Sequence, residues 1–192
     1  DMGLGKTHQV MGLLCLLADK DPEARTLVVC PRGVLEHWHT LLARFAPGLK
    51  VHLFHGPSRS LDGLTAGGVV LTTYDILFRS IDDLLEHTWA VTVFDEAQRI
   101  KNWLTKIASA VKTIPCRYAF VLTGTPLENR LEDLYSLMQV VDPKVLGPLW
   151  RYIVDFHVTD VRGKVLGYRN LALLRRRLAP VMLRRDRRLV RD

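Results

Sequence analysis

The sequence has little cysteine and no long apolar run, and each shortage excludes a class of protein. Its three cysteines, Cys15, Cys30 and Cys116, form no C-x-x-C pair, so we expect neither a disulfide framework nor a zinc site, and a reducing compartment is the simplest reading. The longest apolar stretch lies near residues 10–18, far short of the roughly 20 residues that span a membrane. No basic-then-apolar leader opens the chain. We therefore expect neither secretion nor a membrane partner.

The composition also lacks the marks of disorder and of an acidic protein. Of the 192 residues, 48% are hydrophobic and 24% are charged, which is typical of one ordinary domain or slightly more. The net charge of +7 comes entirely from residues 169–192, which carry nine arginines and two aspartates, because the rest of the chain is balanced. Such a basic tail suits nucleic acid, and it equally suits a solvated helix beside an acidic partner domain.

Short β-branched runs alternate with helical patterns up to about residue 142. We expect strands at 26–30, 50–54, 69–73, 90–94 and 118–122, and helices at 9–18, 35–45, 76–85, 105–112 and 131–140. This alternation predicts an α/β fold, with a parallel sheet that carries helices on both faces.

The pattern changes after Asp142. Pro143, Gly147 and Pro148 interrupt it, and a polar stretch near residues 163–167 follows that could be a hairpin or a loop. An arginine-rich helix is then expected at 171–178. We therefore predict an α/β lobe over residues 1–142 and a helical or loop appendage over 143–192.

The chain opens with what reads as the end of a phosphate-binding loop. Gly3 and Gly5 would let backbone N–H groups face phosphate oxygens, and the helix that follows points its positive end at them. Lys6 would reach the β- and γ-phosphates of a bound nucleotide, and the Thr7 hydroxyl would ligate Mg²⁺. Taken singly, the motif could also be an incidental glycine-rich helix start.

An acidic pair follows the apolar strand expected at 90–94. Ligands bind at the carboxyl ends of parallel strands, so Asp95 would hold Mg²⁺ through water and Glu96 would polarise the attacking water in phosphoryl transfer. Two acids in a solvated loop are the alternative for this motif alone. Its pairing with Gly5-Lys6-Thr7 in one sheet argues against that alternative.

A third polar group follows the strand expected at 118–122. Thr123, Gly124 and Thr125 could hydrogen-bond the acidic pair and sense the γ-phosphate. They could also cap the next helix, and the two roles are compatible.

These motifs, in this order, resemble the Swi/Snf-type branch of the superfamily 2 helicase-like ATPases, a family of double-stranded DNA translocases. The resemblance spans residues 1–192 and rests on GLGKT (3–7), LVVCP (27–31), VVLTTYD (69–75), DEAQRIKN (95–102) and VLTGTPLENRLEDLYSLMQVVDP (121–143). GKVLGYRN (163–170) and LRRRLAPVMLRR (174–185) resemble the bacterial members. Gln98 stands where the commoner DEAH box has histidine and is similar to the DEAQ variant.

The resemblance implies the first RecA-like lobe of a P-loop ATPase that uses ATP and Mg²⁺ and couples hydrolysis to movement on DNA. It assigns catalysis to Glu96, Asp95, Lys6 and Gln98. It also implies loops that grip one strand's phosphates through backbone amides and hydroxyls, without reading sequence. The residues of these loops are Pro31, Arg32, Gly33, Thr72, Thr73 and Tyr74. Additional phosphate contacts, or simply a solvated surface, are expected of Arg99, Lys101 and His55.

The resemblance further implies that part of the motor lies outside these residues. The strand before the phosphate loop and a second RecA-like lobe, which would supply an arginine finger, are missing, so we expect residues 1–192 alone to hydrolyse ATP poorly or not at all. The arginine cluster at 184–191 is not assigned as a finger. Stacking on a base is one interpretation of Trp38 and Trp103. Trp38 lies on an apolar helical face, so we expect it to be buried instead.

Two other functions remain open at this point. One is a lobe of an RNA helicase or a restriction-type translocase, which would use the same chemistry on a different track. The other is a non-catalytic module that lends its basic tail to nucleic acid or to a partner protein. The expected location is the bacterial cytoplasm, on the nucleoid.

Overall fold

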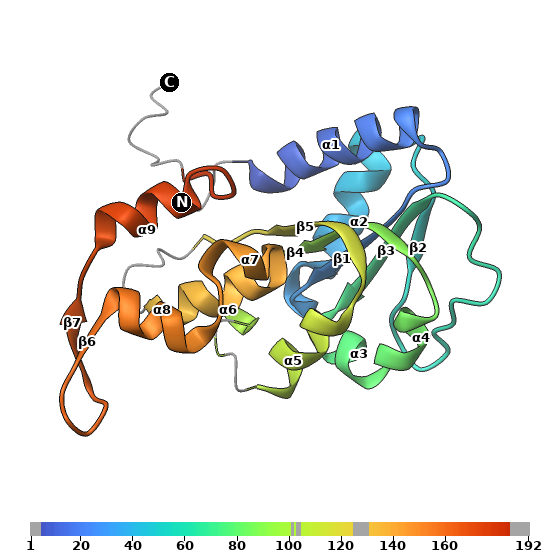
Figure 1. Ribbon diagram of the computed structural model, residues 1–192. Coiled ribbons are helices and arrows are strands. Elements are labelled where there is room, and N and C mark those ends of the chain that lie inside the picture. Colours follow the sequence, from blue (N-terminus) through green and yellow to red (C-terminus); the bar gives the residue numbers. More distant parts are fainter. Residues whose placement is uncertain (1–4, 101, 103–104, 125–130, 185–192) are drawn as a thin grey trace.

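A single parallel sheet forms the centre of the chain. The computed structural model describes residues 5–100, 102, 105–124 and 131–184. Within these residues, five parallel strands pair in the order β2-β3-β1-β4-β5 (Figure 1). The strands are β1 (Arg25–Cys30), β2 (Val51–Leu53), β3 (Gly68–Thr73), β4 (Trp89–Phe94) and β5 (Cys116–Val121). The predicted α/β fold with a parallel sheet is confirmed.

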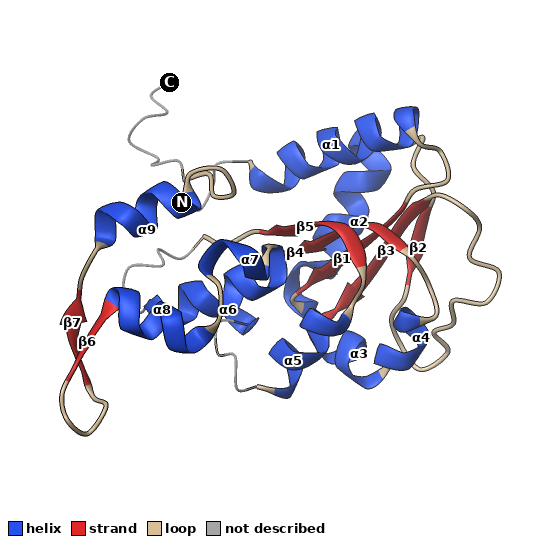
Figure 2. Cartoon of the chain, viewed as in Figure 1, coloured by secondary structure: helices blue, strands red, loops and turns tan. Residues whose placement is uncertain are grey.

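Helices cover both faces of this sheet (Figure 2). One face carries α1 (Lys6–Lys20) and α2 (Arg32–Phe45). The other face carries α3 (Tyr74–Arg79), α4 (Ile81–Leu85), α5 (Lys106–Thr113) and α6 (Leu131–Val141), together with the short 3₁₀ helix η1 (Ala97–Ile100). Because both faces are covered, the inner strands are apolar almost throughout and do not alternate with polar residues.

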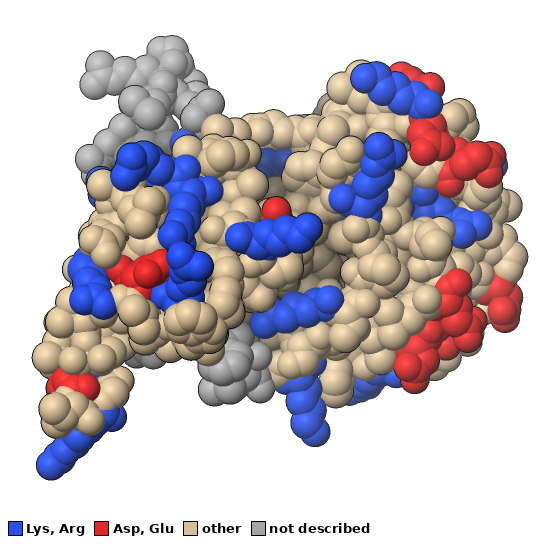
Figure 3. Space-filling view, in the orientation of Figure 1, with Lys and Arg blue, Asp and Glu red and all other residues tan. Residues whose placement is uncertain are grey.

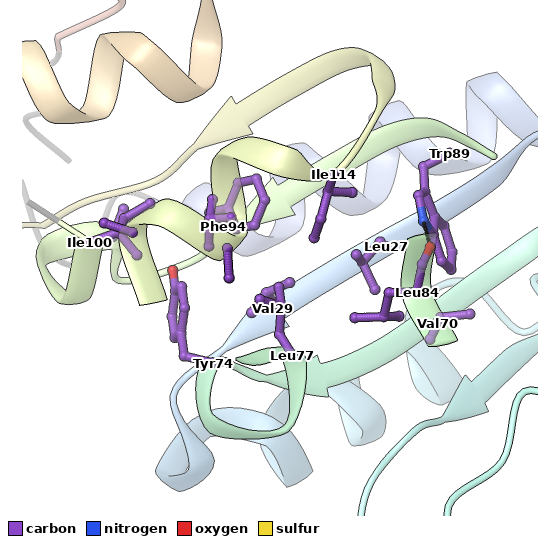
Figure 4. Packing of buried hydrophobic residues seen from close by; sticks show 14 of the residues in the cluster. Leu27, Val29, Val70, Tyr74, Leu77, Leu84, Trp89, Phe94, Ile100 and Ile114 are labelled. Carbon is purple, nitrogen blue, oxygen red and sulfur yellow. Dashed lines mark hydrogen bonds between the residues drawn. The ribbon is translucent and has the colours of Figure 1, made fainter. Parts of the chain in front are cut away.

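Successive strand residues therefore belong to two different cores. Val28 and Cys30 pack under α1 and α2, whereas Leu27 and Val29 pack under α3 and α5. Figure 4 shows the second core, in which Phe94 and side chains from several strands and helices converge. The sheet is thus held from both sides, which fixes the positions of the loops at its ends.

The predicted helix at 76–85 is wrong as a single helix, because the chain breaks at Ser80. Ser80 ends α3 and precedes α4, with φ −121° and ψ 36°. Its side chain is buried and its hydroxyl accepts a hydrogen bond from Arg59 Nε at 3.0 Å. A serine that bonds outside the helix favours such an interruption.

The residues after Asp142 add no strand to the main sheet within the described part. They form α7 (Pro143–Leu146), α8 (Leu149–Phe156), the antiparallel pair β6 (His157–Thr159) and β7 (Val165–Tyr168), and α9 (Leu171–Leu178). A third core joins them to α6, whose Leu134 faces this core while its Leu137 faces the main one. The division at residue 142 stays a prediction, since α6 belongs to both parts.

Gly67 lies at a close approach between two backbone segments, and a side chain there is expected to destabilise the fold. Its φ is +74°, and a Cβ would stand 2.0 Å from the carbonyl oxygen of Pro22. The left-handed φ alone costs about 1–3 kcal/mol for a residue with a Cβ, and the clash adds to this. In Gly67→Ala the free energy of unfolding should fall by at least that amount, measured by urea titration.

Gly12 offers a matched control for that substitution. It lies in α1, and a Cβ there would meet no atom within 4 Å. Gly12→Ala should raise the free energy of unfolding by about 0.5–1 kcal/mol, because alanine suits a helix interior better. An unchanged urea midpoint in Gly67→Ala would contradict the backbone contact with Pro22.

Acidic side chains gather at one end of the strands, where some Lys and Arg also lie, and basic side chains gather at the other end (Figure 3). Exposed acids lie just before the strands begin, in the last turn of α1, in the turn after it, and in and after α4: Asp19, Asp21, Glu23, Asp82, Asp83 and Glu86. Exposed arginines lie over α8 and α9 at the other end: Arg151, Arg169, Arg175 and Arg176. No helix among the described residues has the length and apolar character needed to cross a membrane.

Candidate active site

Four strand ends lie in register along one edge of the sheet. Val29 pairs with Phe94, and Cys30 pairs with Thr73. Phe94 in turn pairs with Val121. Because these strands are parallel, the loops that follow them leave the sheet at the same edge. The sequence-predicted acidic box and the third motif therefore lie on neighbouring strands, β4 and β5.

The N-terminal end of α1 lies on the same side of the molecule (Figure 1). The helix has 15 residues and β1 has six, which correspond to about 22 Å and about 20 Å. Since α1 packs against β1 and runs in the opposite direction, its first turn lies near the end of that strand. Lys6 and Thr7 occupy this turn, and Gly5 precedes them with φ 66°. Gly3 lies outside the described residues.

Asp95 is held by hydrogen bonds from three directions. Its side chain belongs to a residue that is only 8% exposed. The Nε1–H of Trp38 donates to Oδ2 at 2.8 Å, and the backbone N–H of Glu96 donates to Oδ1 at 2.9 Å. The Tyr74 hydroxyl donates to the Asp95 backbone oxygen at 2.8 Å. The carboxylate is therefore fixed in orientation, yet neither donor to it carries a charge.

The Cys30 thiol reports the electrostatics of this edge. Burial, and then the negative charge of Asp95, raise the pKa of Cys30 to about 12. A thiol with that pKa stays protonated at neutral pH and is unreactive. The sulfur donates to the Thr72 carbonyl oxygen at 3.7 Å, so Cys30 acts as a buried apolar residue beside the site and not as a nucleophile.

Glu96 has an uncommon backbone conformation. Its φ is 47°, in the left-handed region that residues with a Cβ rarely adopt. Such a conformation costs on the order of 1–3 kcal/mol and occurs most often at functional sites. The turn leaves the Glu96 side chain partly exposed while that of Asp95 is buried. The two acids therefore have different environments, as their different predicted roles require.

The third motif is joined to the acidic box by backbone hydrogen bonds. Leu122 donates its N–H to the Phe94 oxygen at 2.9 Å, and Ala97 donates to the Leu122 oxygen at 2.9 Å. Thr123 and Gly124 follow directly and are partly exposed, as Glu96 is. Gln98 is exposed on η1. Thr125 lies outside the described residues.

The first loop predicted to contact DNA is accessible. Pro31 caps the N-terminus of α2 in extended conformation, and Arg32 and Gly33, the first residues of that helix, are exposed. Their backbone N–H groups belong to the first turn of a 14-residue helix, where intrahelical partners are lacking. This loop is open to an anionic ligand.

The second loop predicted to contact DNA has its hydroxyls engaged inside the protein. Thr72 donates to the Phe54 oxygen at 2.9 Å, and Tyr74 donates to Asp95. Thr73 accepts from the Ile76 N–H at 3.4 Å and caps α3. All three residues are at most 3% exposed. The expectation that these three residues contact DNA is therefore corrected, because each is buried as a whole, the backbone amide as well as the hydroxyl.

The structure describes only some of the other residues that were predicted to contact DNA. His55 is partly exposed, beside Gly56, whose φ is 86° and whose oxygen accepts from Arg59 at 2.9 Å. The Arg99 side chain, Lys101 and Trp103 lie outside the described part of the chain.

Sequence reasoning missed the roles of two aromatic residues. Trp38 was correctly predicted to be buried, and it is 1% exposed, but its bond to Asp95 was not foreseen. The available signal was that a buried tryptophan N–H usually needs a polar partner. Tyr74 was assigned to DNA, although its position directly after a buried strand also permits a side chain that turns inward.

Comparisons with known proteins agree with this geometry. The family model described as SNF2-related domain matches residues 1–192. The chain is 32% identical to the DNA excision repair protein ERCC-6-like of Danio rerio, over 97% of its own length and 14% of that protein. It is 33% identical to YwqA of Bacillus subtilis, over 98% of its own length and 21% of that protein.

A solved structure matches as well. The SWI2/SNF2 ATPase core of Sulfolobus solfataricus in complex with dsDNA superposes with a TM-score of 0.83 and 38% identity, covering 96% of this chain and 38% of that one. The chain thus spans about a fifth or less of these two curated relatives and under half of that structure. The likeness in fold to a SWI2/SNF2 ATPase core confirms the RecA-like lobe.

Proposed function

This chain belongs to the SNF2-related domain family, and we propose that it forms the ATP-binding lobe of a DNA-dependent ATPase that moves along double-stranded DNA. The observation that carries the proposal is the arrangement at one edge of the sheet. Asp95 and Glu96 follow β4 there, and the first turn of α1, with Lys6 and Thr7, lies on the same side. This combination supports phosphoryl transfer more than any other chemistry.

Each residue of the site has a role in the proposed reaction. Backbone amides at Gly3 and Gly5 and the Lys6 ammonium would bind the phosphates of ATP. Glu96 would accept the proton of the attacking water, for which its partial exposure suits it. Gln98, and the coupling loop Thr123–Thr125, would complete the hydrogen bonds around the γ-phosphate, with Gln98 in the role that the DEAQ box gives it.

The donor set suits Mg²⁺. The Asp95 carboxylate and the Thr7 hydroxyl are oxygen ligands of the kind this ion takes, and the two N–H donors to Asp95 leave its charge uncompensated. The described residues contain no group of three or more His, Cys, Asp or Glu that could hold a metal. That fits an ion held chiefly by nucleotide phosphates and water. When bound, it would neutralise phosphate charge.

The proposed track is the phosphate backbone of double-stranded DNA. Support comes from the exposed helix start at Arg32 and Gly33 and from the solved relative whose title names dsDNA. Contacts through backbone amides position a protein without reading bases, so we propose movement without sequence preference. Further contacts are proposed for Pro31, Arg99 and Lys101.

The complete motor would need more than this lobe. We propose that a second RecA-like lobe closes over the nucleotide and supplies an arginine finger, which is worth about 10³–10⁵ in rate. The relatives are several times longer than this chain, which supports a longer protein. A bacterial host and a place on the nucleoid are also proposed, with the YwqA likeness in support.

Nucleotide binding by residues 1–192 tests the proposal directly. Lys6→Ala should lower the affinity for Mg²⁺ with a non-hydrolysable ATP analogue at least about tenfold, because a charged hydrogen bond to phosphate contributes about 1.5–3 kcal/mol. Isothermal titration calorimetry measures this. Lys20→Ala, an exposed lysine at the far end of the same helix, is the matched control and should bind as wild type does.

The nucleic-acid partner is tested by fluorescence anisotropy with double-stranded DNA, single-stranded DNA and RNA at several salt concentrations. Tightest binding to double-stranded DNA is expected. A preference for RNA would favour the RNA helicase alternative. DNA binding without any nucleotide binding by the wild type would favour the non-catalytic module and defeat the proposed ATPase.

A further inference from the structure

We propose that Trp38 is a positioning residue that couples the DNA-facing start of α2 to the Asp95 carboxylate, and that Tyr74 is a positioning residue that holds the Asp95 backbone. The inference rests on the proposed function. Trp38 belongs to α2, which begins at Arg32 directly after Pro31. Tyr74 is the first residue of α3, which begins at the second loop. Trp38 thus belongs to a helix whose exposed N-terminus carries a proposed contact with the DNA backbone, whereas Tyr74 belongs to a helix whose first residue is buried.

Both side chains end on one residue of the ATP site. Trp38 Nε1 donates to Asp95 Oδ2, and the Tyr74 hydroxyl donates to the Asp95 backbone oxygen, each at 2.8 Å. The backbone N–H of Glu96 donates to the other carboxylate oxygen, Oδ1. The plane of the Asp95 carboxylate is therefore set by α2 on one side and by the acidic turn on the other, while α3 fixes the backbone beneath it.

The two contacts reach Asp95 from opposite faces of the sheet. Trp38 packs in the core under α1 and α2, and Tyr74 packs in the core under α3 and α5. Figure 4 shows the Tyr74 oxygen directed away from α3, towards the segment that follows Phe94. Trp38 is 1% and Tyr74 2% exposed. Neither ring has room to move independently of its helix, so a displacement of the helix is passed to the hydrogen bond.

Hydrogen bonds are sensitive to such displacements. They weaken steeply when donor and acceptor separate or lose alignment, and those to a charged, buried carboxylate are stronger than neutral ones. DNA that shifts α2 would therefore change how Asp95 is held. Linkage makes the effect reciprocal, so nucleotide bound near Asp95 should change DNA affinity by the same factor.

The coupling is measured on residues 1–192 as a ratio of affinities. Calorimetry gives the affinity for Mg²⁺ with the non-hydrolysable ATP analogue, with and without a saturating short DNA duplex. The wild type should show a ratio of about fivefold or more. Trp38→Phe, which keeps an aromatic ring but lacks the N–H, should bring the ratio close to one. Tyr74→Phe should lower the ratio as well. A variant that changes the nucleotide affinity equally with and without duplex leaves the ratio unchanged, so the ratio reports the coupling alone.

Matched controls lose a hydrogen bond of the same kind elsewhere. Trp89 Nε1 donates to the Leu84 oxygen at 3.0 Å, and the Tyr135 hydroxyl donates to the Gly147 oxygen at 3.0 Å. Trp89→Phe and Tyr135→Phe remove bonds that involve neither Asp95 nor Glu96, so they should keep the wild-type ratio. If the role of Trp38 were only structural, Trp38→Phe would lower the ratio no more than the two control substitutions do, and the inference would be wrong.

A second measurement uses the wild-type protein alone. The indole N–H resonance of Trp38 in a ¹H–¹⁵N spectrum should shift when Mg²⁺-nucleotide is added and again when the duplex is added, while that of Trp89 stays in place. If both ligands bind and the Trp38 resonance is unmoved, or the wild-type ratio is one, the inference is overturned while the proposed function stands. If the wild type binds neither ligand, the proposed function fails first.

Discussion

Glu96→Gln should abolish most ATP turnover while leaving nucleotide binding intact. In the proposed two-lobed protein with double-stranded DNA present, we expect the turnover number to fall about 10²–10⁴-fold, the usual contribution of a general base. Glutamine has the same shape and can hydrogen-bond the attacking water, but it cannot accept the proton. The backbone N–H of residue 96 still donates to Asp95, so the geometry of the site is retained.

Phosphate release measures the turnover, and calorimetry with the non-hydrolysable analogue measures the binding. Glu36→Gln is the matched control, because Glu36 is an exposed acid on α2 that lies 3.9 Å from His39, and it should turn over at the wild-type rate. Wild-type turnover by Glu96→Gln would show that another group is the base. Equal losses of binding and turnover would instead indicate that Glu96 holds the turn together.

Tyr152→Ala should destabilise the whole chain. Tyr152 is fully buried in the third core, where its ring contacts Tyr135 and Phe156 and its hydroxyl donates to the Leu131 oxygen at 2.8 Å. Removing a large buried ring costs about 3–5 kcal/mol. Because α6 is shared by the third core and the main one, we expect a single unfolding transition at lower urea. A separate early transition would instead indicate two units divided near residue 142.

Tyr152→Phe and alkaline pH test the hydroxyl alone. Tyr152→Phe keeps the ring, so it should cost only about 1–2 kcal/mol. Burial first, and then Glu132, Tyr168 and Tyr135, raise the pKa of Tyr152, so the folded state favours its neutral form. Its contribution is therefore fully present below the unfolded pKa of about 10 and is lost as pH rises above that value. Tyr152→Phe should weaken this alkaline loss of stability, measured by urea titration from pH 8 upwards.

The architecture of the lobe could be predicted because its signals are local. β-branched runs bounded by glycine and proline mark buried parallel strands, and all five were expected close to their observed bounds. The helices α7 and α8 were not expected, because Pro143 and Pro148 were interpreted as breakers. Pro143 instead occupies the first position of α7, and Pro148 caps α8, where proline's fixed φ assists a helix start.

Within the site, only the residues that directly follow a strand could be placed from the sequence. Placing Asp95 and Glu96 at a sheet edge needs nothing beyond the apolar run before them. The left-handed φ of Glu96 could not be foreseen, since nothing in the local sequence requires it. The bond from Trp38 to Asp95 joins residues 57 positions apart, and which partner a buried N–H finds depends on how two helices and a sheet pack together.

The opposite charges at the two ends of the strands have a consequence for how the molecule meets a polyanion. Arginines over α8 and α9, and acids in the turn after α1 and near α4, give the lobe a permanent electric dipole moment along the strand direction. In the field of a DNA duplex, such a molecule rotates during diffusion so that the arginine-rich end, at the C-terminal ends of the strands, faces the DNA and the acidic end faces away. The encounter rate, more than the lifetime of the complex, should then respond to ionic strength.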